Sequence, residues 1–70
     1  MNIDRLLIEM IYQSRSLNHN PTKILLGCYV LKELKNIAGD MVNMLDGDKL
    51  EFMGIEIEES NEYKFLIGIV

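Results

Sequence analysis

The chain has few of the residues that build disulfides, metal sites and catalytic centres. Its 70 residues include one cysteine, one histidine, one proline and no tryptophan. A disulfide within the chain is therefore impossible. A structural zinc ion is not expected either, because zinc takes four ligands and His19 and Cys28 are the only soft ones. A single unpaired cysteine is typical of a reducing compartment, so we predict a cytoplasmic protein without metal or other cofactor.

Long apolar runs and an excess of basic charge are also missing. No apolar run approaches the roughly 18 residues of a transmembrane helix, and no signal-peptide pattern follows Met1. Acidic residues outnumber basic ones by 11 to 7, which gives a net charge of −4. Nucleic-acid phosphates attract basic surfaces, so direct nucleic-acid binding is not expected. We predict a complete, short chain that folds as a single domain over residues 1–70 and contacts neither membrane nor nucleic acid.

The chain does contain a large share of apolar residues, 49% of the total. A domain of this length buries only about 60% of the surface of its unfolded chain, and its core contributes roughly 3–5 kcal/mol. Small domains add stability through disulfides, metals or oligomerisation, and the first two are not expected here. We therefore predict a homo-oligomer, with a twofold dimer as the simplest form.

The N-terminal half carries two helical patterns with a short strand between them. Apolar residues at helical spacing predict an amphipathic helix over residues 3–17, with Asn2 as its N-cap. Pro21 ends this segment, and residues 22–26 (TKILL) predict a strand that Gly27 stops. A second helix is expected to follow from about residue 28.

The second helix has an apolar face that is wider than one sheet contact requires. Its two apolar stripes continue to Leu45, so we favour a continuous helix over an earlier end at Ala38 with Gly39 as its cap. Glycine costs about 1 kcal/mol in a helix interior, which keeps the second possibility open. The surplus apolar face predicts an interface between copies, and its candidate residues are Met41, Val42 and Leu45.

The C-terminal segment alternates apolar and polar residues with period two. The alternation begins at Ile55, breaks at residues 60–61 and resumes to the end of the chain, which predicts a β-hairpin. The apolar face of this hairpin is expected to face the core. Its members are Ile55, Ile57, Tyr63, Phe65, Ile67 and Ile69.

The segment before the hairpin is predicted to add a turn and a further stretch of strand. Residues 46–48 (DGD) predict the turn, and residues 49–53 an extended segment. Gly54 is interpreted as a β-bulge, which lets Leu50 and Phe52 share the inner face of the hairpin.

These elements predict an α+β fold with the order α-β-α-β-β. The two helices pack on one face of a small antiparallel or mixed three-stranded sheet. One edge of that sheet is free to pair with another copy.

Catalysis has little support in the sequence. His19 lies in a polar loop between two asparagines, and we interpret it as a solvated side chain. Cys28 at the start of a helix fits a structural cysteine better than a nucleophile, although only the tertiary fold decides whether His19 can activate it. We therefore predict a protein that is not an enzyme and has no catalytic or cofactor-binding residue.

Five carboxylates gather on and around the predicted hairpin, and Glu56 and Glu58 share its outer face. They form either a solvated face that discourages edge-to-edge aggregation or an acidic patch that docks a basic partner. The candidate partner-binding residues are Glu51, Glu56, Glu58, Glu59 and Glu62.

The segments PTKILLGCYVLKELKN, LEFMGIEIEES and FLIGIV resemble part of the major capsid proteins of tailed bacteriophages. There a proline-led strand precedes a helix, and two strands follow, the second ending near a glycine. The resemblance covers residues 21–70 and carries over no functional residue. The chain lacks the long N-terminal arm, spine helix and extended loop of those proteins. The resemblance implies a phage or prophage origin and therefore a location in the host cytoplasm.

Two functions follow as expectations. The first is a small non-enzymatic accessory protein that binds a host protein or a small-molecule ligand and inhibits or sequesters it. The second is a self-assembling structural or capsid-associated module.

Overall fold

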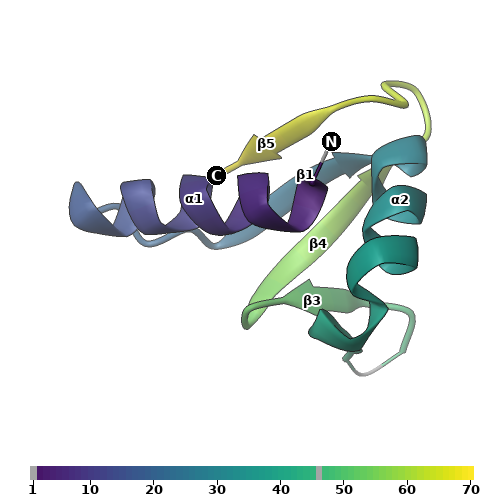
Figure 1. The fold of residues 1–70 in the computed structure, drawn as a ribbon, viewed down its shortest axis with the longest axis horizontal. Helices are drawn as coiled ribbons and strands as arrows, with labels where there is room; N and C mark the ends of the chain where they lie inside the picture. Colours follow the sequence, from purple (N-terminus) through teal and green to yellow (C-terminus); the bar gives the residue numbers. More distant parts are fainter. Residues whose placement is uncertain (1, 46) are drawn as a thin grey trace.

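The structure is a computed structural model that describes residues 2–45 and 47–70. These residues form two α-helices and five strands (Figure 1). The helices are α1 (Ile3–Ser16) and α2 (Cys28–Ala38), and a short 3-10 helix, η1 (Gly39–Met41), follows α2. The strands are β1 (Lys23–Gly27), β2 (Val42–Met44), β3 (Leu50–Phe52), β4 (Ile55–Ser60) and β5 (Ile67–Ile69). The predicted α+β class with two helices is confirmed.

Helix α1 forms because its apolar residues recur at helical spacing. Ile3, Leu7 and Ile11 lie on one face and are buried in the core. Asn2 occupies the N-cap position without a side-chain hydrogen bond, and Asp4 lies in the first turn, where its charge suits the helix dipole. The predicted helix over residues 3–17 is confirmed to within one residue.

The strands form one mixed sheet in the order β2-β3-β4-β1-β5. β1 lies inside the sheet, parallel to β4 and antiparallel to β5. The prediction of three strands was wrong, because residues 50–60 contribute two strands, β3 and β4, and residues 42–44 add another. The apolar run Ile24–Leu26 suits a strand that has neighbours on both sides.

The prediction of a continuous helix through Gly39 was also wrong. α2 ends at Ala38, whose φ of −143° and ψ of 41° lie outside the helical region. Val42 is extended and pairs with Phe52 of β3. Glycine is a weak helix former and valine is β-branched, so the sheet hydrogen bonds of β2 outweigh further helical turns.

Gly54 belongs to a tight turn and not to the predicted bulge. Met53 and Gly54 have φ values of 55° and 78°, and two positive values in succession are typical of the type I′ turn that joins two strands. Across this turn β3 pairs antiparallel with β4, and Phe52 lies opposite Ile55. The turn therefore produces the shared apolar face that the sequence predicts, by a different backbone geometry.

The turn predicted at residues 46–48 falls partly outside the described residues, since Asp46 is not among them. Gly47, with a φ of 75°, and Asp48 form a turn ahead of β3. For these two residues the prediction is confirmed.

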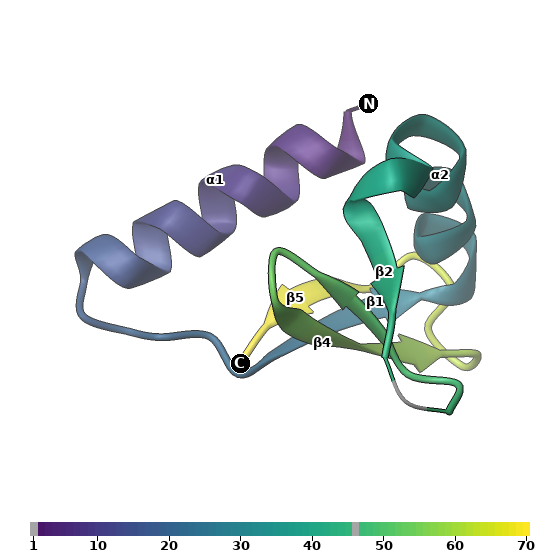
Figure 2. The same ribbon diagram turned by 90° about the horizontal axis from the view of Figure 1, so that it is seen from below.

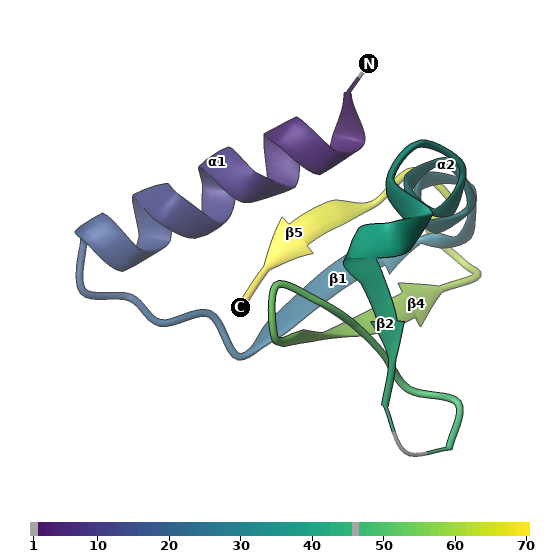
Figure 3. The ribbon, with the colours of Figure 1, turned by 60° about the horizontal axis from the view of Figure 1, so that its bottom comes forward.

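β4 and β5 do not form the predicted hairpin, because β1 lies between them. The chain leaves β4 at Ser60, crosses the end of β1 and returns along its other side as β5 (Figure 3). Ile55 and Ile57 are buried as predicted, whereas Tyr63 and Phe65, which were expected to face the core, are 63% and 75% exposed. The observed arrangement gives the apolar strand β1 a neighbour on each side. A β4–β5 hairpin would have left β1 at an edge of the sheet.

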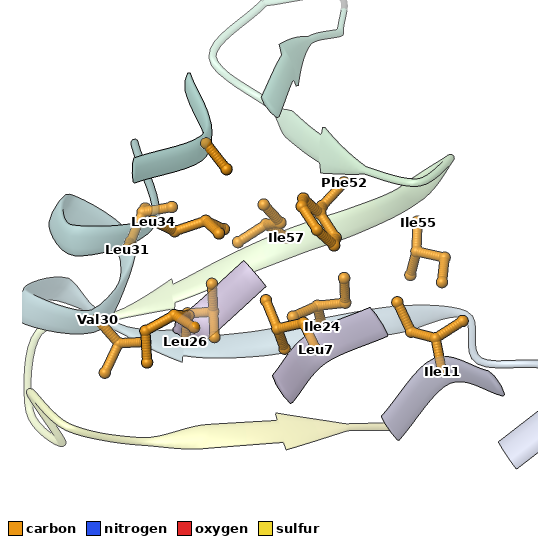
Figure 4. Packing of buried hydrophobic residues seen from close by; sticks show 12 residues of the cluster. Leu7, Ile11, Ile24, Leu26, Val30, Leu31, Leu34, Phe52, Ile55 and Ile57 are labelled. Carbon is orange, nitrogen blue, oxygen red and sulfur yellow. The ribbon is translucent and has the colours of Figure 1, made fainter. Parts of the chain in front are cut away.

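Both helices pack on one face of the sheet, as predicted, and leave the other face open (Figure 2). Neither helix is long and apolar enough to cross a membrane. The buried core lies between the helices and the sheet (Figure 4). Its members are Ile3, Leu7, Ile11, Ile24, Leu26, Val30, Leu31, Leu34, Ala38, Phe52, Ile55 and Ile57.

Gly27, the last residue of β1, lies directly beneath the crossing segment, residues 61–66. Its N–H donates a hydrogen bond to the Leu66 carbonyl oxygen at 2.8 Å, and the Tyr29 N–H donates one to the Lys64 carbonyl oxygen at 3.1 Å. A Cβ on Gly27 would overlap the backbone carbonyl groups of Lys64 and Tyr63. Glycine is therefore required here for the close approach of two backbones.

Replacing Gly27 by alanine should destabilise the fold severely. The added methyl group must displace the crossing segment, and overpacking of this kind costs about 3 kcal/mol or more when the obstacle is backbone. For a domain of this size the melting temperature should fall by more than roughly 10 °C in thermal unfolding followed by circular dichroism.

Gly39→Ala is the matched control for this measurement. No atom lies within 4 Å of a Cβ at Gly39, and its φ of −59° and ψ of −30° suit alanine. This variant should gain up to about 1 kcal/mol of stability. Equal melting temperatures for the two variants would contradict the crossing geometry.

Candidate functional site

His19 and Cys28 lie too far apart to act as a base and a nucleophile. His19 precedes β1 and Cys28 follows it, so this five-residue strand separates them by on the order of 13 Å. Cys28 is a free, half-buried thiol at the start of α2. Among residues 2–45 and 47–70, no three His, Cys, Asp or Glu side chains are grouped so that they could hold a metal ion.

The open face of the sheet carries three of the five carboxylates that the sequence singles out. Glu51 and Glu56 lie opposite each other on β3 and β4, and Glu58 follows on β4. Lys23 on β1 places its Nζ 4.0 Å from Glu56 Oε2 and 3.6 Å from Glu58 Oε1. Lys49 Nζ lies 3.8 Å from Glu56 Oε1. These lysines compensate much of the negative charge, so the face attracts a basic partner less than the sequence alone indicates.

The other two carboxylates do not join this face. Glu59 follows Glu58 on β4 and therefore points to the opposite side, at the exposed end of the strand. Glu62 is exposed in the crossing segment. A partner-binding role for the five carboxylates stays a prediction, and the structure brings together only Glu51, Glu56 and Glu58.

The candidate interface residues at the end of α2 are mostly used within the chain. Met41 and Val42 are half-buried against the core. Leu45 is 37% exposed, and its N–H donates to the Lys49 carbonyl oxygen at 2.7 Å. These residues leave a second copy little apolar surface, and their role as an interface stays a prediction.

The aromatic residues have an unexpected distribution. The chain has three tyrosines and two phenylalanines, and Phe52 is the one that is buried. The exposed fractions of the others are 59% for Tyr12, 52% for Tyr29, 63% for Tyr63 and 75% for Phe65. An aromatic side chain can bury roughly 150–250 Å², so a small chain that exposes most of its aromatic rings gives up core stabilisation. Exposed aromatic residues are enriched at the interfaces of proteins in general.

Two of these rings meet at the end of the sheet where α2 begins. The Tyr29 and Phe65 rings contact edge to face, with centroids 5.3 Å apart and planes at 83°. Lys64 Nζ lies 5.3 Å from the centroid of the Tyr29 ring, within the range of a cation–π contact. Beside the rings is a surface hollow of about 430 Å³. We call its lining residues the aromatic corner: Ile3, Tyr29, Val30, Glu33, Phe65 and Ile67.

The crossing over Gly27 positions the aromatic corner. The Tyr29 N–H is held by the Lys64 carbonyl oxygen, which places the first turn of α2 beside the residue that precedes Phe65. The crossing segment itself is a compact turn, because the Tyr63 N–H donates to Ser60 Oγ at 3.1 Å and the Leu66 N–H donates to the Tyr63 carbonyl oxygen at 3.1 Å. These hydrogen bonds place the main chain at Tyr29 beside the main chain that leads into Phe65.

Sequence reasoning missed this site because it assigned Phe65 to the inner face of a hairpin. The corner takes residues from α1, α2 and the segment leading into β5, which are distant in sequence. A local signal was available, since Tyr63 and Phe65 flank a lysine directly after a polar stretch. This pattern is as consistent with an exposed loop as with a strand.

No protein-family model matches the sequence, and no curated protein or solved structure shows significant similarity to it.

Replacing Lys23 by glutamine should weaken the fold slightly and in a salt-dependent manner. The substitution removes the cation between Glu56 and Glu58, whose surface ion pairs are worth about 0.5–1 kcal/mol at most. Urea unfolding should show a loss of that order at low salt, and most of it should disappear in 1 M NaCl, where the Debye length is about 3 Å.

Lys32→Gln serves as the control, since Lys32 is exposed on α2 and forms no ion pair with the described residues. Its unfolding free energy should not change. A loss for Lys23→Gln that persists in 1 M NaCl would contradict an electrostatic origin.

Proposed function

We propose that this chain is a non-enzymatic binding protein that holds a partner protein at the aromatic corner. The observation that carries the proposal is the hollow of about 430 Å³ beside the exposed Tyr29 and Phe65 rings. Among the described residues that line the hollow, Glu33 is the one carboxylate, and none is a cysteine, histidine or serine. The chemistry of the corner suits apolar contact better than proton or group transfer.

The physical properties of the corner favour binding. Tyrosine and phenylalanine bury a large area while losing few rotatable bonds, and such residues dominate the binding energy of many interfaces. Tyr29 and Phe65 already hold each other edge to face, so less side-chain order remains to be imposed on binding. Lys64 and Glu33 provide a polar rim of both signs beside the apolar lining.

These properties define the expected partner. It presents a large aliphatic or aromatic side chain to the hollow, with polar groups beside it that complement Glu33 and Lys64. The net charge of −4 favours approach of a basic partner, which raises the association rate more than the affinity. A small accessory protein of this kind acts by covering a surface of its partner, which inhibits or sequesters that partner.

A self-assembling structural module is the second candidate function. It is favoured by the free edge of β5 at one margin of the sheet. The resemblance of residues 21–70 to a segment of phage capsid proteins supports the same candidate and a phage origin. The β5 edge offers backbone groups and the aromatic corner offers side chains, and the two surfaces share Ile67.

Selection of a random peptide library displayed on phage tests the binding proposal. Peptides retained by the wild-type protein should be enriched in tryptophan, phenylalanine and leucine. Phe65→Ala should weaken their binding about tenfold or more, which corresponds to the 1.4 kcal/mol or more typical of an interface anchor. Titration by fluorescence anisotropy with a synthetic peptide from the selection measures the change.

Tyr12→Ala is the matched control, since Tyr12 is as exposed as Tyr29 but lies on α1, nine residues beyond Ile3. Its peptide affinity should equal that of the wild type. Phe65→Ala should keep the wild-type melting temperature within a few degrees, because a side chain this exposed adds about 0.5 kcal/mol or less to stability. Selected peptides that bind Phe65→Ala as tightly as the wild type would show that the corner is not the binding site.

A further inference from the structure

β5 forms one margin of the sheet (Figure 1). Part of its backbone points away from β1. The Leu66 carbonyl oxygen accepts a hydrogen bond from β1 at 2.8 Å, and the Val70 N–H donates one to β1 at 2.9 Å. In an antiparallel ladder alternate residues bond to the same neighbour, so Gly68 also faces β1. The N–H and C=O groups of Ile67 and Ile69 therefore point outward, where a further strand could pair with them.

This edge is short, since β5 has three residues, but it lacks the other features that keep exposed strands from pairing. Those features are charged side chains, proline and a bulge. β5 has the sequence Ile-Gly-Ile, and its register with β1 is regular from Ile67 to Ile69. A further strand could therefore pair with this edge, because its outward N–H and C=O groups are present and no charged side chain lies on β5.

The flank of α1 beside this edge is apolar and incompletely buried. Asp4 and Arg5 line a surface hollow with Ile37 of α2, so that flank of α1 faces α2. Helical spacing puts three apolar residues on the opposite flank, toward β5. Leu6 and Met10 are half-buried there, and Leu17 is 75% exposed.

We propose that two copies of this chain pair through β5 across a twofold axis to form one continuous sheet. Antiparallel pairing about Gly68 sets Ile67 opposite Ile69 of the second copy, and Ile69 opposite Ile67 of the second copy. Both are outward-facing residues, so each pair exchanges two backbone hydrogen bonds. Gly68 then lies opposite Gly68 of the second copy on the open face of the sheet, at the axis.

The apolar flank beside the edge favours a second copy over a foreign strand. A net charge of −4 on each copy opposes association, and this opposition is weakest where the surfaces that meet carry no charge. β5 and the Leu6–Met10–Leu17 flank contain no charged residue, and a twofold axis brings each flank toward that of the other copy. A foreign strand would fill the edge and leave Leu17 in water. The inference does not depend on binding at the aromatic corner, and it deepens the second candidate function, which uses the same edge.

Gly68 allows this pairing to be tested without disturbing the folded chain. No atom lies within 4 Å of a Cβ built on Gly68, so a side chain there is accommodated by the monomer. In the dimer the two side chains would face each other across the axis, where like charges oppose pairing. Gly68→Glu and Gly68→Lys should each weaken dimerisation about tenfold or more.

The mixture of the two variants gives the sharpest result. Combined in equal amounts, Gly68→Glu and Gly68→Lys should form a heterodimer, because opposite charges then meet at the axis. Asn43→Glu and Asn43→Lys are the controls, since Asn43 is exposed on β2 at the other margin of the sheet. The controls should dimerise like the wild type.

Sedimentation velocity and native mass spectrometry read out the result. The wild type should be a dimer of two 8.1 kDa chains at tens of micromolar, and amide hydrogen exchange at Ile67 and Ile69 should slow as the concentration rises. A wild type that stays monomeric at hundreds of micromolar would overturn the proposal and leave the edge to a foreign strand. The twofold axis at Gly68 would be overturned if Gly68→Glu or Gly68→Lys alone dimerised with wild-type affinity. It would also be overturned if the mixture of the two variants stayed monomeric.

Discussion

The passage of residues 61–66 over Gly27 is the constraint on which the rest of the structure depends. It carries the chain from β4, on one side of β1, to β5 on the other side. Backbone contact at Gly27 leaves no room for a side chain, and hydrogen bonds to Leu66 and from Tyr29 fix the crossing on both sides. The result is a central strand with two neighbours, which lets a 70-residue chain bury Ile24 and Leu26 completely.

The same crossing creates the surfaces that are available for binding. It brings Phe65 against Tyr29 and so forms the aromatic corner. It also leaves β5 at the margin of the sheet with an uncharged edge. The acidic open face differs from both, because Lys23 and Lys49 pair with its carboxylates and reduce its net charge. A change at Gly27 would therefore alter the core, the corner and the edge together.

Sequence periodicity predicted the features that depend on neighbouring residues. The helix over residues 3–17, the strand that Gly27 ends and the inward direction of Phe52 and Ile55 are all local patterns. The sheet order could not be predicted in this way. The alternation in β4 and β5 is equally consistent with direct pairing and with an intervening strand, and burial of the distant β1 decides between them. The corner was missed for the same reason, since its rings are brought together by that sheet order.

Cross-strand contacts measured by NMR in an isotope-labelled sample test the position of β1 most directly. We expect nuclear Overhauser effects from β1 to both β4 and β5, including Leu25 to Glu58 and Leu25 to Gly68, and a through-hydrogen-bond coupling between the Gly27 amide and the Leu66 carbonyl group. No direct backbone contacts should link β4 to β5. A ladder of such contacts between β4 and β5, with β1 at the edge of the sheet, would contradict this account.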